Sequence, residues 1–124
     1  MVIKKPIYPD RIRRIVGSFS WLDHRLISDG YLHVMTRNEI PLYFFLALVG
    51  DKKGLSFYSD ASICELLKMD LLEFHRARKL LVQRSLIVYK NGLFQLLQLP
   101  NPPDRETSNT QGNFQSIKEI MQML

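Results

Sequence analysis

The side chains best suited to recognition chemistry lie on one face of a predicted helix, Leu71 to Arg84. At 100° per residue the apolar side chains of this segment gather on one face: Phe74, Ala77, Leu80 and Leu81. The opposite face carries one leucine and four polar side chains: Leu72, His75, Arg76, Lys79 and Gln83. The four polar residues offer imidazole, guanidinium, ammonium and amide groups, which can hydrogen-bond to the edges of DNA bases.

This polar face of the helix has no carboxylate of its own, whereas an ordinary solvated face mixes charges of both signs. We therefore predict that four residues contact DNA bases: His75, Arg76, Lys79 and Gln83. The alternative is a charged face that meets only solvent.

The flanking segments would hold this helix in place. Asp70 and Glu73 have the spacing of a capping box at its start. Before it, a tight turn at 68–70 follows a short helix over 59–67, with Ser59 as a plausible N-cap. The buried stripe of that short helix is expected to consist of Ile63, Leu66 and Leu67.

A β-hairpin follows the basic helix. Residues 86–99 are two apolar runs around Asn91-Gly92, the favoured pair for a two-residue type I′ turn. Residues 55–58 alternate briefly and predict a short first strand.

The segment Arg37 to Gly50 predicts a buried helix, because IPLYFFLALV is apolar on nearly all sides. Thr36 with Glu39 has capping-box spacing, but a start there would lose a backbone hydrogen bond at Pro41. We therefore prefer Asn38 as the N-cap, which puts Pro41 in the first turn.

Residues 1–17 predict an extended basic arm, since Pro6 and Pro9 disfavour helix. The arm could follow a phosphate backbone or a minor groove. It could also be a weakly ordered terminus whose isoleucines pack on the core, which is the interpretation we favour, and both can hold. The isoleucines concerned are Ile3, Ile7, Ile12 and Ile15.

Between the arm and the buried helix, residues 23–32 predict one short helix that ends near Gly30 and carries Leu22, Leu26 and Ile27 on one side. Phe19 and Trp21 are expected to be a buried anchor for the N-terminal segment. The alternative is a stacking platform for unpaired bases.

Phosphate contacts are predicted from basic and amide side chains in the loops and in the arm, with solubilising charge as the alternative. These candidates are Lys52, Lys53, Lys90, Asn91, Arg13 and Arg14.

The composition narrows the class of protein. The 124 residues carry a formal charge of +5, concentrated in the arm and the central block, which suits an anionic partner. Cys64 is the single cysteine, so no internal disulfide forms, and His24, His33 and His75 lack metal-ligand spacing. There is no signal-peptide pattern and no apolar run long enough to span a membrane. We expect a cytoplasmic protein, not an enzyme, without metal, cofactor or small-molecule substrate.

The C-terminal part reads as a Pro-rich polar linker over 100–112 and an amphipathic helix over 113–124. The helix could pack on its own domain, dimerise or dock on a larger complex, and the linker favours an intermolecular role. The predicted partner-binding residues are Phe114, Ile117, Ile120, Met121 and Leu124.

The central part of the chain resembles the winged helix-turn-helix domains of bacterial regulators and of phage and plasmid replication proteins. The resemblance lies in the buried helix and in the stretch that follows it, SDASICELLKMDLLEFHRARKLLVQRSLIVYKNGLFQL. The resemblance covers roughly residues 36–99. It implies that the helix at 71–84 enters the major groove and that the hairpin is the wing. The phrase RIRRIVGSFSWLDHRLI is similar to one in small helix-turn-helix proteins of bacterial mobile elements.

We therefore expect an α+β protein: an arm (1–17), a winged helix-turn-helix domain with a three-helix core and a small antiparallel sheet (18–99), a linker (100–112) and a C-terminal helix (113–124). The expected function is non-catalytic binding of double-stranded DNA, in transcriptional regulation or in replication or transposition of a mobile element. A homodimer or a larger protein complex is expected, because one recognition helix gives modest affinity. One alternative is a protein-interaction adaptor that uses the winged helix and the C-terminal helix to dock on a larger complex. Another is a single-strand nucleic-acid binder that uses Phe19, Trp21 and the basic arm.

Overall fold

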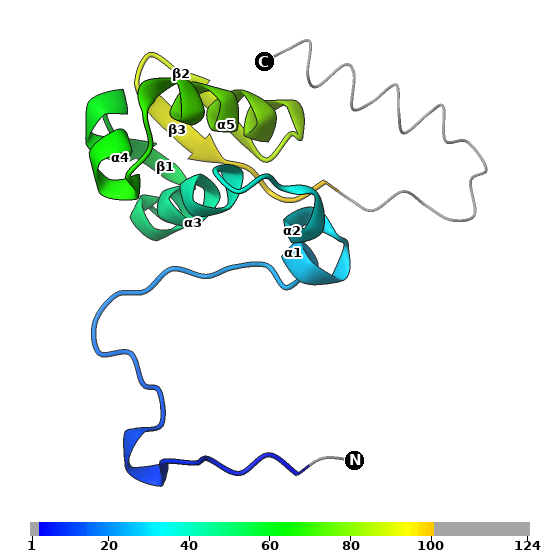
Figure 1. Cartoon of the computed structure of the whole chain (residues 1–124). Coiled ribbons are helices and arrows are strands. Elements are labelled where there is room, and N and C mark those ends of the chain that lie inside the picture. Colours follow the sequence, from blue (N-terminus) through cyan, green and yellow to red (C-terminus); the bar gives the residue numbers. More distant parts are fainter. Residues whose placement is uncertain (1–2, 101–124) are drawn as a thin grey trace, which may run out of the picture.

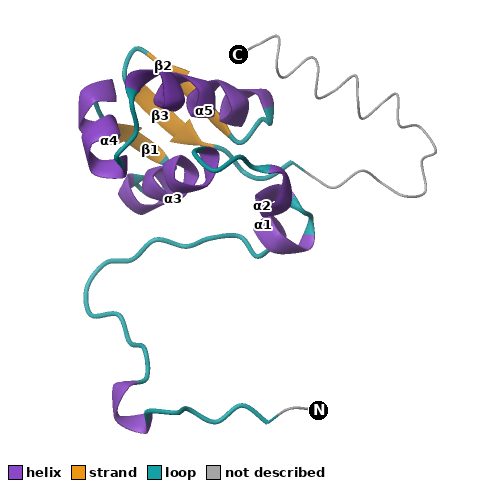
Figure 2. Ribbon diagram, in the orientation of Figure 1, coloured by secondary structure: helices purple, strands orange, loops and turns teal. Residues whose placement is uncertain are grey.

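The computed structural model describes residues 3–100, which form an α+β arrangement of short helices and one small antiparallel sheet (Figure 1). Figure 2 shows the helices gathered around the sheet and a long N-terminal segment that runs away from them. In chain order the elements are the 3-10 helix Pro9–Arg11, α1 Arg25–Ser28, α2 Tyr31–Val34, α3 Glu39–Val49, β1 Leu55–Phe57, α4 Asp60–Leu67, α5 Leu71–Gln83, β2 Ile87–Lys90 and β3 Leu93–Leu96.

One hydrophobic core joins α3, α4 and α5 to the sheet. The helix α5 packs against α3, α4 and β2, and α3 packs against β1 and β3. The largest buried side chains of this core come from all of these elements except β1: Leu42, Leu46, Ile63, Phe74, Leu81, Leu86, Ile87 and Phe94. Burial of each such side chain contributes about 1.5–3 kcal/mol, so this cluster holds α5 in position.

The sheet has the strand order β1-β3-β2, with β3 antiparallel to both neighbours. The predicted hairpin is confirmed: Lys90 pairs with Leu93, and Asn91 and Gly92 have φ angles of 51° and 84°. Two consecutive positive φ values are the signature of a type I′ turn. The first strand is also confirmed, at Leu55–Phe57. As an edge strand, β2 lies directly beside α5.

The buried helix α3 begins at Glu39, so the prediction of Asn38 as N-cap is confirmed, although the Asn38 side chain makes no capping hydrogen bond. The Glu39 carboxylate instead accepts a hydrogen bond from the Thr36 N–H at 2.7 Å. One half of the alternative capping box is therefore present as well. Gly50 follows the last residue of the helix, as expected.

Several predictions for the first third of the chain are wrong. Residues 23–32 do not form one helix: Gly30, with φ at +80°, separates α1 from α2. This left-handed residue turns the chain between the two short helices, and Leu26 is buried while Leu22 and Ile27 are exposed.

The N-terminal arm does not pack on the core, which corrects the favoured expectation for its isoleucines. All four are exposed: Ile3, Ile7, Ile12 and Ile15. The physical reason is the path of the chain, because the arm runs away from the domain (Figure 1) and its isoleucines therefore do not reach the core. The expected buried anchor is wrong too, because Phe19 is 69% exposed and Trp21 is 79% exposed.

The short helix α4 begins after Ser59, whose Oγ accepts a hydrogen bond from the Ser62 N–H at 3.1 Å, as predicted for an N-cap. Its buried stripe is narrower than expected. Ile63 is fully buried and Leu67 is partly buried, but Leu66 is 60% exposed, because α4 contacts the core along one edge only. Within residues 3–100, no helix is both long and apolar enough to cross a membrane.

Candidate nucleic-acid interface

The start of α5 is fixed by local hydrogen bonds. The Asp70 Oδ1 accepts from the Glu73 N–H at 2.7 Å, and the Glu73 Oε1 accepts from the Asp70 N–H at 3.0 Å. This is the predicted capping box. In the turn before it, Lys68 has a left-handed backbone and the Met69 side chain is buried. The angle between α4 and α5 is therefore set by a short turn with an apolar anchor.

The polar face of α5 lies open to solvent. All four predicted base-contacting residues are exposed: His75, Arg76, Lys79 and Gln83. The opposite face is buried through Phe74, Ala77 and Leu81. Because the buried face is held by the core, the four polar side chains project from a rigid helix and form one row, which we call the α5 row.

An arginine missed by the sequence analysis lies at the border of this row. The Arg78 guanidinium is 4.2 Å from the ring centroid of Tyr89 and 5.0 Å from that of Phe74. Its Nη1 lies 3.3 Å from Asp60 Oδ1 on α4. Arg78 thus links α5 to β2 and to α4 by stacking and an ion pair, and each cation–π contact contributes about 0.5–1 kcal/mol or more.

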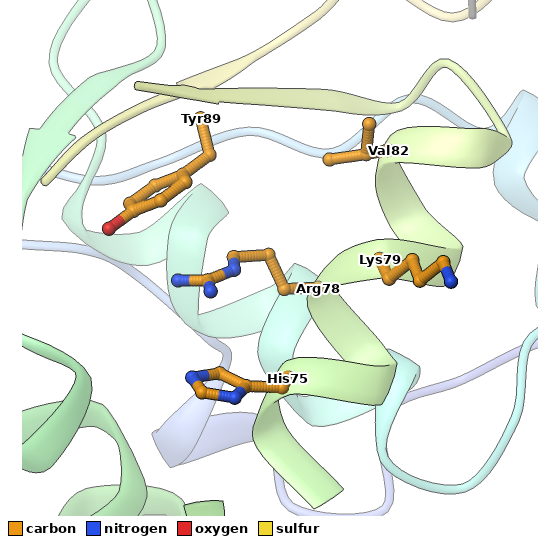
Figure 3. A pocket seen from close by; sticks show the side chains of 5 residues that line it. All are labelled: His75, Arg78, Lys79, Val82 and Tyr89. Carbon is orange, nitrogen blue, oxygen red and sulfur yellow. The ribbon is translucent and has the colours of Figure 1, made fainter. Parts of the chain in front are cut away.

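A surface hollow of about 400 Å³ is lined by residues of both α5 and β2. Figure 3 shows the residues that line it: His75, Arg78, Lys79, Val82 and Tyr89. The Arg78 guanidinium lies between the His75 ring and the Tyr89 ring, while the Lys79 side chain leaves the helix in another direction (Figure 3). Basic side chains therefore border a depression between an exposed helix and an edge strand.

A carboxylate also stands beside this row, which corrects the view that the face is free of acids. The Asp60 Oδ2 lies 3.4 Å from the His75 Nε2. It comes from α4, so the pattern of α5 alone could not show it. Arg76, Lys79 and Gln83 have no such partner within the described residues, and they are the freest groups of the α5 row.

The basic residue at the end of α5 has a structural role. The Arg84 Nε donates to Glu39 Oε1 at 2.6 Å, and its Nη2 donates to Glu39 Oε2 at 3.2 Å and to the Val34 carbonyl at 2.9 Å. Glu39 has no exposed surface. Burial raises the pKa of Glu39, but the hydrogen bonds from Arg84 and Thr36 outweigh it, so that pKa falls below its ordinary value.

The sequence contains a sign that Glu39 needs a positively charged partner. Glu39 is the one carboxylate in the otherwise apolar segment 39–49, and such a charge is buried only with a partner. Nothing in the sequence identifies Arg84 as that partner, because it lies in a distant element. Arg84 therefore does not belong to the free basic surface.

The predicted phosphate contacts do not lie together. Leu55 pairs with Gln95 and Phe57 pairs with Leu93, so the turn before β1 and the hairpin tip lie at opposite ends of the sheet. Lys52 and Lys53 are exposed at one end, and Lys90 and Asn91 are exposed at the other. Arg13 and Arg14 are exposed on the arm, away from both ends (Figure 1).

The turn that carries Lys52 and Lys53 is itself well defined. The Asp51 Oδ1 accepts hydrogen bonds from the Leu55 N–H at 2.9 Å and from the Lys53 N–H at 2.8 Å. These two bonds hold the pKa of Asp51 below its ordinary value. The two lysines thus project from a fixed loop.

The residues considered for catalysis or metal binding do not form a site within the described part of the chain. Cys64 is partly buried against the core, and burial raises the pKa of its thiol. Among residues 3–100, no three or more His, Cys, Asp or Glu side chains group as metal ligands. The predicted partner-binding residues of the C-terminal helix lie outside the described residues: Phe114, Ile117, Ile120, Met121 and Leu124.

Comparisons of the chain with protein-family models, with curated proteins and with solved structures find no match.

Proposed function

We propose that the protein binds double-stranded DNA without catalysing a reaction, and that it does so as a winged helix-turn-helix. In this proposal α4, the turn at 68–70 and α5 form the helix-turn-helix, and the β2–β3 hairpin is the wing. The order α3-β1-α4-α5-β2-β3 and the sheet order β1-β3-β2 are compatible with that layout. The proposal is also supported by the resemblance of residues 36–99 to this class.

The observation that carries the proposal is the α5 row on a helix whose other face is buried. A major groove about 12 Å wide admits such a helix, and Arg, Lys and Gln side chains can then reach base edges. Arg76, Lys79 and Gln83 are the proposed base contacts, with His75 at the edge of the row beside Asp60. Tyr89 of β2 lies against Arg78 of α5, so the next residues, Lys90 and Asn91 at the hairpin tip, follow directly after the part of the wing that touches this helix. In the proposal they contact phosphates.

The remaining basic residues take a secondary place in the proposal. Lys52 and Lys53 lie at the far end of the sheet, so in the same complex they reach only flanking phosphates. Arg13 and Arg14 belong to an extended arm and would follow the DNA backbone or a minor groove. A dimer would present two copies of α5 to one site, as modest single-helix affinity favours.

The test is fluorescence anisotropy on random duplex DNA, titrated from low to physiological salt. The variant Arg76→Ala/Lys79→Ala is compared with Lys52→Ala/Lys53→Ala, which also removes two positive charges but at the far end of the sheet. We expect the α5 variant to weaken binding more than the loop variant does, because a helix in the major groove brings its basic side chains closer to the DNA charge than a loop at the far end of the sheet does. The slope of log affinity against log salt should fall by about 0.9 for each phosphate that the variant no longer neutralises.

The outcome that would overturn the proposal is equally clear. Absence of binding at low salt would remove DNA as the partner. Equal weakening by the two variants would remove α5 as the recognition helix and leave only a nonspecific basic surface.

A second function, that of a protein-interaction adaptor, is favoured by a different observation. Many large apolar side chains are exposed along residues 3–22, and another protein that binds this segment would cover them. The same DNA experiment separates the two functions, because an adaptor does not need Arg76 and Lys79. The cellular process in the proposal is transcriptional regulation, or replication or transposition of a bacterial mobile element. It rests on two resemblances: that of residues 36–99 to bacterial regulators and phage and plasmid replication proteins, and that of the N-terminal phrase to proteins of bacterial mobile elements.

A further inference from the structure

A second depression, larger than the one beside β2, lies on another side of the domain. It has a volume of about 710 Å³. Its walls are the segment 18–25, the C-terminal half of α3 with Leu46 and Ala47, the turn at 50–54, and the segment 96–99 that follows β3. We call it the α3 groove.

One wall of the α3 groove carries apolar side chains that lack cover within the described residues. Phe19 and Trp21 line the groove and are 69% and 79% exposed. The backbone that carries these two residues is tied to α3, because the Ser20 Oγ between them donates a hydrogen bond to the Leu48 carbonyl at 3.1 Å. Two large aromatic rings are therefore held beside a groove but left uncovered, which indicates that something packs against them.

The path of the chain indicates which segment covers the two aromatic rings. Leu97, Gln98 and Leu99 form part of the groove wall, and the described chain ends one residue later, at Pro100. This exit is anchored: Leu99 is buried, and the Tyr31 hydroxyl donates to the Pro100 carbonyl at 3.3 Å. The residues that follow therefore start at the rim of the α3 groove.

The remaining sequence suits a return to the groove. Residues 101–112 can span roughly 40 Å when extended, more than a return to the adjacent groove needs. Residues 113–124 carry apolar residues at one helical face and polar residues at the other. A tether of this length holds the segment at an effective concentration on the order of millimolar, so even a weak contact is populated.

We propose that segment 113–124 docks in the α3 groove of its own chain and covers Phe19 and Trp21. The apolar face with Phe114, Ile117 and Met121 faces the aromatic wall. This inference does not depend on DNA binding. It assigns the amphipathic segment an intramolecular place, in contrast to the intermolecular role that the linker favours on sequence alone.

The experiment uses the full chain and its single tryptophan, Trp21, which lies in the groove wall. Acrylamide quenching and the emission maximum of Trp21 are measured for the intact protein and for Ile117→Asp/Met121→Asp. The matched control is Gln115→Asp/Gln122→Asp, which adds the same two charges on the polar face of the same segment. We expect the apolar-face variant to shift the emission to longer wavelength and to lose protection from acrylamide. The control should behave as the intact protein does.

Three results would overturn the proposal. The first is full quenching of Trp21 in the intact protein, and the second is equal loss of protection in both variants. The third is protection that disappears on hundredfold dilution, which would place the segment in the groove of a second copy. Unchanged thermal unfolding of the domain in both variants verifies that the changes in Trp21 fluorescence do not come from unfolding.

Discussion

The helix α5 and the segment 3–22 are both rich in basic residues, and they present them in opposite ways. In α5 one apolar face is buried through Phe74, Ala77 and Leu81, and the four polar side chains of the α5 row project from a helix that the core holds, although Leu71 and Leu72 at its start are exposed. In the segment 3–22 basic and large apolar side chains are exposed together, on a chain that is mostly extended. A basic composition therefore says little by itself. A row of charges becomes a recognition surface when a core fixes its geometry, whereas exposed apolar side chains require a partner to cover them.

The largest expected effect tests whether the core really fixes α5. Arg84→Ala removes the partner of a fully buried Glu39, and an uncompensated buried charge costs about 3–5 kcal/mol. Arg76→Ala, eight positions earlier on the same helix but exposed, should change the free energy of unfolding by less than about 0.5 kcal/mol. Urea unfolding of both variants measures this. Similar costs for the two arginines would show that the division between structural and exposed basic residues is mistaken.

A smaller effect is expected from pH, through the same ion pair. The pKa of Glu39 in the folded protein lies below its ordinary value of 4.5, so the folded state binds fewer protons than the unfolded chain in that range. The stabilisation is fully present above about pH 4.5 and is lost as the pH falls through the folded-state pKa. Urea unfolding between neutral and acidic pH should show this loss.

Glu39→Gln provides the control, because Asp23 and Asp51 also have lowered pKa values and add to the loss of stability in acid. The variant should be less stable at neutral pH and should depend less steeply on pH below about 4.5. An unchanged slope would assign the acid sensitivity to the exposed aspartates instead.

The smallest expected effect concerns the arm. Deletion of residues 1–17 should change the free energy of unfolding by less than about 0.5 kcal/mol, because the side chains of residues 3–17 are exposed and bury no core surface. Thermal and urea unfolding of the shortened chain test this. A loss of about 2 kcal/mol or more would mean that the arm packs on the domain, and the contrast with α5 would then fail.

The sequence predicted what depends on neighbouring residues. The Asp70–Glu73 capping box, the Ser59 cap and the Asn91-Gly92 turn each involve atoms a few residues apart, and all three are present. The buried and exposed faces of α5 follow from helical periodicity and were also predicted.

What the sequence analysis missed depends on contacts between distant elements. The Glu39–Arg84 pair joins α3 to the end of α5, and the stacking of Arg78 on Tyr89 joins α5 to β2. The exposure of Trp21 and of the four isoleucines depends on where the extended segment runs relative to the core. Periodicity and composition carry no information about such distances, so the burial predicted from them for the N-terminal third was wrong.

Because structural and exposed residues are separated along α5, the exposed residues can be substituted without loss of the structural contacts. Arg78 and Arg84 hold the helix to its neighbours, and the α5 row takes no part in the core. Positions 76, 79 and 83, whose side chains have no partner within the described residues, can therefore be randomised together in a library while the domain keeps its fold. If α5 is the recognition helix that we propose, its target preference and the stability of the domain can evolve independently.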